Sequence, residues 1–281
     1  MLRQRVITAL VLAGLLLGSL SVASPWPFAL LTLALMAAAG WEWGRLNQAA
    51  MISALALGAT VALGGAAALA AGWTRNPPAS LWWWATAAWV TAGTVALRSG
   101  PAVWPQLPKA ARLLMGLLAL WAAWLALAHA RVVGINFMIS VLALVWMADI
   151  CAYFGGRAWG RRKLAPAISP GKSWEGVWSG MAGVVALAAF WIWLDSRFGF
   201  DGPSLYSRLL HSLGVAGLGA ALLALCGLSV VGDLVESLVK RAAGAKDSSR
   251  LLPGHGGVLD RVDALLPVLP AALALAGWSS P

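Results

Sequence analysis

The chain has 281 residues, of which 60% are hydrophobic and 11% are charged, and its mean hydropathy is +0.79. Soluble domains carry about 25% charged residues, so this composition excludes an ordinary water-soluble globule, and its hydrophobicity excludes a disordered chain. We therefore expect a polytopic membrane protein whose net charge of +10 lies beside anionic lipid or an anionic substrate, with no nucleic-acid partner.

Nine apolar runs approach the roughly 20 residues that a helix needs to cross a bilayer. They are 6–24, 27–43, 50–72, 80–97, 113–130, 132–155, 176–194, 212–232 and 262–278. The breaks between them carry charges or turn-forming residues, as in Asn76-Pro77-Pro78. We predict an all-α, polytopic integral membrane protein with about nine transmembrane helices. The second and ninth runs are short or contain proline, which leaves the count open between roughly eight and ten.

The first run follows two arginines, Arg3 and Arg5, and ends in Ser21-Val22-Ala23, a pattern that also fits a signal peptide. Another apolar run follows at once, so we expect the first run to be retained as a span. Orientation follows from the positive charges, which collect on the cytoplasmic side of membrane proteins. With the N-terminus cytoplasmic, 16 of the 20 Lys and Arg residues fall in inside segments, and this favours that orientation.

The segment after the eighth run, Gly232–Arg241, carries a dense polar stripe. If this segment is helical, Asp233, Glu236, Ser237 and Lys240 share one face, and leucines and valines form the opposite face. We expect an amphipathic continuation of the eighth helix. Taken alone, the stripe is also compatible with a solvated interfacial helix.

A glycine-rich loop follows this stripe. Its Pro253-Gly254-His255-Gly256-Gly257 segment disfavours regular helix, and its backbone N–H groups suit an anion. The surrounding acids are Asp233, Asp247, Asp260 and Asp263, and the cations are Lys240, Arg241, Lys246, Arg250 and Arg261. Carboxylates hold Mg²⁺, and Lys and Arg neutralise phosphate, so the combination indicates polyphosphate chemistry.

A second polar cluster lies earlier in the chain. Asp149 falls near the inner end of the sixth run, and an acid at membrane depth is a functional-site candidate. The later Gly171-Lys172-Ser173 is similar to part of a P-loop, but Pro166 stands where glycine is needed, so we exclude a P-loop NTPase. Lys172 and Ser173 remain candidates for phosphate, with a plain turn as the alternative. Glu42, near Arg45, we interpret as a structural pair at an inner helix end.

The stretch Ser237–Asp263 resembles the signature of the phosphatidate cytidylyltransferases, or CDP-diacylglycerol synthases. It reads S-L-V-K-R-x4-K-D-S-S-R-L-L-P-G-H-G-G-V-L-D-R-V-D, and every position of that signature is filled. The stretch Asp149–Gly176 also resembles the family, with Ser173 where threonine is common. The likeness covers roughly residues 140–275, whereas the earlier chain resembles the family in hydropathy and in the Arg5–Leu10 run.

The resemblance implies a Mg²⁺-dependent reaction in which CTP and phosphatidic acid give CDP-diacylglycerol and pyrophosphate. It also implies a helical membrane fold, a homodimer, and a place in the bacterial inner membrane with the active site facing the cytoplasm. A monovalent cation such as K⁺ beside the Mg²⁺ is left open. Two alternatives stay open as well: a cytidylyltransferase for another lipid phosphate, and an ion transporter.

Carried across residue by residue, the resemblance implies a role for each polar position. The expected metal ligands are Asp233 and Asp260, with Asp149 as a further candidate. The expected catalytic residues are Asp233, Lys240, Asp260, Arg261 and Asp263. The expected substrate-binding residues are Ser169, Lys172, Ser173, Glu236, Ser237, Arg241, Lys246, Asp247, His255, Gly256 and Gly257. We therefore divide the chain into N-terminal transmembrane helices, 1–131, and a C-terminal transmembrane catalytic region, 132–281, with cytoplasmic-face loops 156–175 and 233–261.

Overall fold

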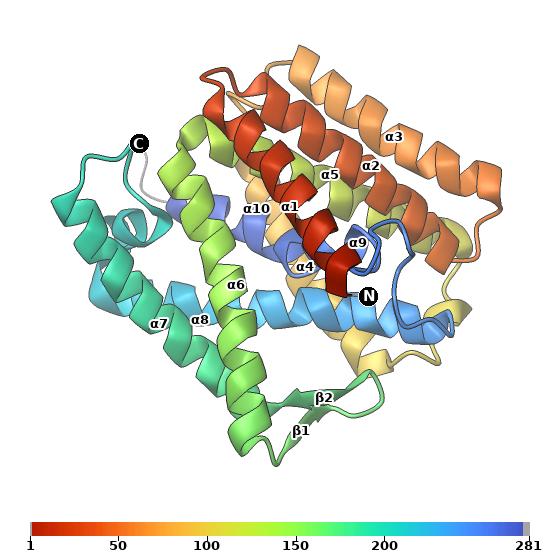
Figure 1. Ribbon diagram of the computed structural model, residues 1–281. Coiled ribbons are helices and arrows are strands. Elements are labelled where there is room, and N and C mark those ends of the chain that lie inside the picture. The colour runs from red at the N-terminus through yellow and green to blue at the C-terminus, as the bar shows by residue number, and fades with distance from the viewer. Residues whose placement is uncertain (1, 278–281) are drawn as a thin grey trace.

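The computed structural model describes residues 2–277, and these are mostly helical (Figure 1). The helices are α1 (Leu2–Ser21), α2 (Trp26–Leu46), α3 (Met51–Ala70), α4 (Ala79–Ser99), α5 (Lys109–Val133), α6 (Ile135–Trp159), α7 (Trp174–Arg197), α8 (Leu205–Ala242), α9 (Leu259–Val262) and α10 (Leu265–Ala276). A 3-10 turn, η1 (Trp104–Gln106), and two short strands, β1 (Lys163–Ala165) and β2 (Ser169–Ser173), complete the fold. Each predicted apolar run thus contains a helix, although Trp278, the predicted end of the ninth, lies outside the described residues.

Five helices in the described part of the chain are long and apolar enough to cross a membrane: α3, α5, α6, α7 and α8. This confirms the membrane character of the chain, while the number of nine spans stays a prediction. Helix α10 has 12 residues, or about 18 Å, which is shorter than the roughly 30 Å of a hydrocarbon core. It lies instead at the centre of the molecule, where it packs against α4, α5, α6 and α8 and is buried along nearly its whole length (Figure 1).

Helices α6 and α7 pack closely because glycines line their contact. A Cβ atom at Gly180 would lie 2.9 Å from the backbone oxygen of Ala148, and one at Gly176 would lie 2.8 Å from that of Ala152. Only glycine allows two backbones to approach this closely. The contact fixes the start of α7 beside the end of α6, and the site described below lies between them.

An antiparallel hairpin of β1 and β2 connects these two helices, and it is a departure from the predicted all-α fold. Lys163 pairs with Ser173, and Ala165 pairs with Ser169. Strand β2 leads directly into α7, where Ser173 is the N-cap and its Oγ accepts the N–H of Gly176 at 3.2 Å. Strands of three and five residues are too short to give a clear alternating pattern in the sequence.

Helix α8 has 38 residues and contains both the eighth apolar run and the predicted amphipathic continuation. Its one non-helical position among the described residues is Gly214, whose φ of 68° is favourable for glycine. The polar stripe begins about five turns later, so it lies on an unbroken part of the helix.

The segments between the helices gather at two ends of the molecule. At one end, the side chain of Arg241 donates from Nε to the backbone oxygen of Ile168 at 3.3 Å, which connects the end of α8 with the hairpin. At the other end, Asp201 accepts the N–H of Asn136 at 3.0 Å. Two segments predicted inside thus contact each other, and a segment predicted outside contacts the predicted outer end of the sixth run, as alternating spans require.

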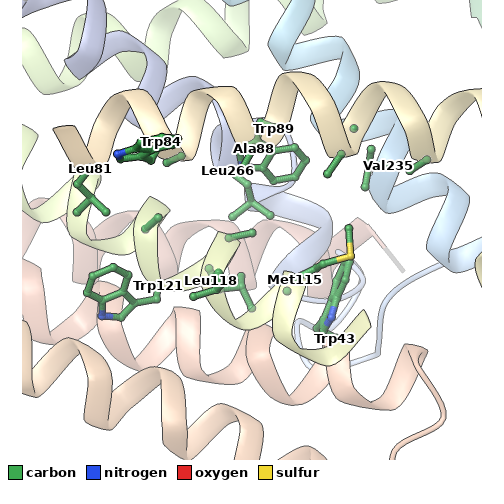
Figure 2. A pocket seen from close by; sticks show the side chains of 18 of the residues that line it. Trp43, Leu81, Trp84, Ala88, Trp89, Met115, Leu118, Trp121, Val235 and Leu266 are labelled. Carbon is green, nitrogen blue, oxygen red and sulfur yellow. The ribbon is translucent and has the colours of Figure 1, made fainter. Parts of the chain in front are cut away.

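An apolar groove of about 370 Å³ lies between α4 and α5, with parts of α8 and α10 behind it (Figure 2). Trp84, Met115 and Trp121 line its sides, and Val235 of α8 lies at one end of it, near Met115. Val235 belongs to the apolar face of α8, opposite the polar stripe. The groove is therefore separated by the width of α8 from the polar groups described next.

Candidate active site

One face of α8 carries the four polar residues that the sequence predicts there. Ser237 donates from Oγ to Oδ1 of Asp233 at 3.3 Å, one turn earlier in the helix. Lys240 forms an ion pair with Glu236, again one turn earlier. The predicted polar face is confirmed, and each half of it contacts a different part of the chain.

The first half of the face meets the hairpin. Lys172 of β2 forms an ion pair with Asp233 of α8, and the two side chains are 27% and 28% exposed. Beside them, α6, α7, α8 and the hairpin enclose a cavity of about 660 Å³, which we call the Lys172–Asp233 cavity. Its polar lining includes Asp149, Ser169, Lys172, Ser173 and Asp233, all of them predicted site residues. Its apolar lining includes Val177, Met181 and Val230.

The second half of the face meets the segment that begins α9. Lys240 Nζ donates to Oδ1 of Asp260 at 2.7 Å, and the side chains of Lys240, Glu236 and Asp260 are 13%, 3% and 8% exposed. The N–H groups of Gly257 and Ser248 donate to Oδ2 of Asp260 at 2.8 and 2.9 Å. Burial alone would raise the pKa of Asp260, but hydrogen bonds from Lys240 and Gly257 lower this pKa to about 2. Asp260 is therefore an ionised acceptor at neutral pH.

The loop between α8 and α9, residues 243–258, wraps around the carboxylate of Asp260. Gly256 has a φ of 84°, and a Cβ there would lie 2.7 Å from Oδ2 of Asp260, so glycine is required at this position. Arg261 Nε donates to the backbone oxygen of His255 at 3.1 Å, and Leu252 forms a bridge with Gly256. The predicted loop residues His255, Gly256 and Gly257 therefore lie next to the Asp260 cluster.

Four predicted residues lie outside these contacts. Arg241 donates to the backbone oxygen of Ile168 and is exposed, and Lys246 and Asp247 are exposed on the 243–258 loop. Asp263 accepts a hydrogen bond from the N–H of its neighbour Ala264 at 2.8 Å, its backbone packs against α8, and its carboxylate lies close enough to Asp233 and Lys240 to interact with their charges. Their predicted roles in substrate binding or catalysis stay predictions.

The chain matches the cytidylyltransferase family over residues 3–278. It is also 42% identical to a phosphatidate cytidylyltransferase of Pseudomonas aeruginosa across the full length of both chains. The chain belongs to this family. It is 45% identical over 137 residues to a phosphatidate cytidylyltransferase of Haemophilus influenzae, covering 49% of this chain and 44% of the relative. A phosphatidate cytidylyltransferase of Staphylococcus saprophyticus is 35% identical over 162 residues, covering 57% of this chain and 56% of the relative.

In this cytidylyltransferase, the contacts of Glu42 differ from the pair that the sequence predicts. The expected pair with Arg45 is wrong, because Arg45 donates to the backbone oxygen of Ala49 at 3.4 Å. Glu42 is fully buried and accepts hydrogen bonds from the middle of the 243–258 loop and from the start of α9, for example from Ser249 Oγ at 2.5 Å and from the N–H of Leu259 at 2.7 Å. An acid inside an apolar run was the signal in the sequence, but the sequence does not show what that acid contacts.

The carboxylates of the site offer few protein ligands for a metal ion. Within residues 2–277, no group of three or more His, Cys, Asp or Glu side chains is placed to hold a metal by itself. Asp233 and Asp260 each face a lysine ammonium group, so both already lie in positions that favour a cation. Mg²⁺ is commonly bound by one or two carboxylates with substrate phosphates completing its shell. The residues fit that mode and do not form an all-protein cage.

Proposed function

We propose that this enzyme transfers the cytidylyl group of CTP to phosphatidic acid, giving CDP-diacylglycerol and pyrophosphate, at the polar face of α8. The observation that carries the proposal is the presence of two carboxylate–lysine pairs on that one face, Lys172–Asp233 and Lys240–Asp260. The full-length identity of 42% to a relative named phosphatidate cytidylyltransferase supports the same pair of substrates.

Phosphatidic acid suits the Lys172–Asp233 cavity because the cavity is amphipathic. Lys172 and the hydroxyl groups of Ser169 and Ser173 are donors for a phosphate at its polar side. Met181 and Val230 contribute to an apolar side that suits the lipid next to its headgroup. The acyl chains would remain in the bilayer around the helices.

CTP suits the other half of the face. Lys240 lies there, and Lys246, Arg250 and Arg261 are exposed on or beside the 243–258 loop. These four cations can neutralise a triphosphate that arrives from the aqueous side. Because both halves belong to α8, the two substrates would meet along one helix.

The reaction requires positioning more than proton transfer. A phosphate oxygen of phosphatidic acid attacks the α-phosphorus of CTP, and the bond from that phosphorus to the pyrophosphate oxygen breaks. The attacking oxygen is already largely ionised at neutral pH, since the second pKa of such phosphates is about 6, so no strong base is needed. Lys172 and Lys240 reduce the repulsion between the two polyanions and stabilise the charge that develops on pyrophosphate.

We propose Mg²⁺ as the metal ion of this site. Asp233 and Asp260, one in each half of the face, are the candidate carboxylate ligands, with Asp149 as a further candidate, and K⁺ is a candidate for an adjacent monovalent ion. When bound, Mg²⁺ supplies charge neutralisation for the phosphates and for the leaving pyrophosphate. The acids of the chain contribute oxygen donors, and Lys172 and Lys240 orient those acids.

Substitution of Asp260 by asparagine tests the metal site. Asp260→Asn keeps the shape of the side chain but removes its charge, so we expect incorporation of labelled CTP into chloroform-soluble lipid to fall about 100-fold or more, the scale for losing a key electrostatic contact. EDTA should abolish incorporation by the unchanged enzyme. Near-normal turnover of Asp260→Asn in Mg²⁺ would remove Asp260 from the site, and EDTA-resistant turnover would remove the metal. Competition by other lipid phosphates in this assay tests the choice of phosphatidic acid.

We also propose that the enzyme is a homodimer in the bacterial inner membrane, with its active site facing the cytoplasm. The 16 of 20 cations on the inside segments support this orientation. The grouping of the hairpin and the end of α8 at one end of the molecule agrees with it.

A further inference from the structure

We infer that Glu42 is a positioning residue for the CTP side of the active site, acting through the 243–258 loop. The inference rests on the proposed function, in which this loop receives the nucleotide. Glu42 lies on α2, and its loop partner Ser248 lies 206 positions later in the chain. No role in substrate binding follows from its place in the sequence.

Each oxygen of the Glu42 carboxylate accepts one hydrogen bond from the middle of the loop and one from the junction of the loop with α9. Oε1 accepts from Ser249 Oγ at 2.5 Å and from the N–H of Val258 at 3.0 Å. Oε2 accepts from Ser248 Oγ at 3.2 Å and from the N–H of Leu259 at 2.7 Å. Glu42 thus joins residues 248–249 to residues 258–259 and closes the second part of the loop, residues 250–257, which includes the glycine-rich segment.

The burial of Glu42 makes these four donors necessary. Its side chain is 0% exposed, and no ion pair with it occurs among residues 2–277. A buried carboxylate without a cation is costly unless hydrogen bonds satisfy its oxygens. The conformation of the loop and the burial of Glu42 therefore depend on each other.

Ser248 connects Glu42 to Asp260, the carboxylate that pairs with Lys240. Its hydroxyl lies 3.2 Å from Oε2 of Glu42 and 2.9 Å from Oδ2 of Asp260, and its N–H also donates to Asp260. A hydroxyl has a single proton to donate, so the two carboxylates compete for it. A shift of residues 248–249 would therefore change the hydrogen bonds that orient Asp260.

Helix α2 gives Glu42 a rigid base. The neighbouring Trp43 is buried and donates from Nε1 to the backbone oxygen of Arg112 on α5 at 2.8 Å. Asn47, one turn later, is buried and accepts a hydrogen bond from Trp104 Nε1 at 2.9 Å. Sites held by packed helices are more precise than sites on loops alone, so a loop fixed to α2 inherits that precision.

Glu42→Gln tests the inference. In either orientation, the amide nitrogen of glutamine faces two donors, one of which is a backbone N–H that cannot turn away. We expect the KM for CTP to rise about tenfold, the scale for losing one charge-assisted hydrogen bond. The KM for phosphatidic acid should stay within about twofold, because its cavity is formed by other elements. Trypsin cleavage after the exposed Lys246 and Arg250 should also become several-fold faster.

Asp195→Asn is the matched control. Asp195 also accepts four hydrogen bonds, from the side chain of Asn136 at 2.8 Å, from the N–H and Oγ of Ser204 at 3.0 and 2.5 Å, and from Ser207 Oγ at 2.6 Å. It lies at the opposite end of the molecule, so its substitution should lower the Tm and leave both KM values unchanged. Should Glu42→Gln fail to fold, Ser249→Ala removes one donor and should raise the KM for CTP in the same direction by a smaller factor.

Two outcomes would overturn the inference: an unchanged KM for CTP in folded Glu42→Gln, or an equal rise in the KM of both substrates. Glu42 would then have a structural role alone. Failure of the proposed function would look different, because the unchanged enzyme would not incorporate CTP into lipid. The tryptic comparison of Glu42→Gln with Asp195→Asn would still decide whether Glu42 holds the loop.

Discussion

Each half of the active-site face combines two acids with one lysine. Asp149 and Asp233 lie with Lys172, and Glu236 and Asp260 lie with Lys240. Burial and the nearby Asp263 raise the pKa of Glu236 to about 9, so in the second half Lys240 balances the charge of Asp260. In the first half, ionised Asp149 and Asp233 together carry one negative charge more than Lys172 can balance. This excess attracts a further cation, which gives a physical reason for a divalent ion when the phosphates of two substrates enter the site.

Lys240 has the largest predicted effect on stability, because its removal leaves two buried carboxylates without a cation. We expect Lys240→Met to lower the free energy of unfolding by about 3–5 kcal/mol, as is usual when one partner of a buried ion pair is removed. Thermal unfolding of the detergent-solubilised protein measures this. Lys246→Met is the matched control, and because Lys246 is exposed its effect should stay within about 0.5 kcal/mol.

The double variant Lys240→Met/Glu236→Gln separates stability from catalysis. At neutral pH, folding of Lys240→Met must protonate Glu236, whose pKa burial raises to about 9; glutamine avoids this cost, so part of the lost Tm should return. CTP incorporation should remain low, since the cation beside Asp260 is still missing. Equal Tm values for the unchanged enzyme and Lys240→Met would show that the buried pair contributes nothing.

At the scale of elements, the contact between α6 and α7 determines the shape of the Lys172–Asp233 cavity. Gly180→Ala would place a Cβ 2.9 Å from the backbone oxygen of Ala148, so the two helices must separate. We expect a loss of about 1–3 kcal/mol, typical of overpacking, together with a higher KM for phosphatidic acid. Unfolding in detergent and lipid-dependent kinetics measure the two effects.

Gly219→Ala provides the comparison for that variant. A Cβ at Gly219, inside α8, would meet nothing within 4 Å. Alanine is favoured over glycine in a helix by about 1 kcal/mol, so this variant should be slightly stabilised. We expect Gly180→Ala to lower the free energy of unfolding and Gly219→Ala to raise it. A more stable Gly180→Ala would contradict the close contact between α6 and α7.

Hydrophobic periodicity predicts most of the helices, while polar spacing predicts the face of α8. The nine apolar runs each contain a helix, and the i, i+3, i+4, i+7 pattern from Asp233 to Lys240 does share one face. The hairpin was missed because Pro170 and Gly171 favour a turn and the strands are very short. The contact between Glu42 and Ser248 was missed because no local pattern encodes a pairing across 206 positions. Tertiary packing alone brings those residues together.

At the scale of the whole molecule, the orientation count can be tested directly. A topology reporter inserted after Gly257 should report the cytoplasm, and one inserted after Gly199, between α7 and α8, should report the opposite side. Residues 243–258 belong to the cation-rich segments predicted inside, whereas residues 198–204 belong to a segment predicted outside. A periplasmic signal from Gly257 would reverse the proposed orientation.

The polar stripe on α8 has a consequence for inhibitor design. Asp233 and Lys240 are seven residues apart on one straight stretch, or about 10 Å along the helix axis. Asp233 and Lys240 thus lie on one rigid helix, and their spacing does not change when the surrounding loops move. A bisubstrate compound that links a lipid phosphonate to a cytidine analogue would therefore need one fixed linker length, and shorter or longer linkers should lose potency sharply.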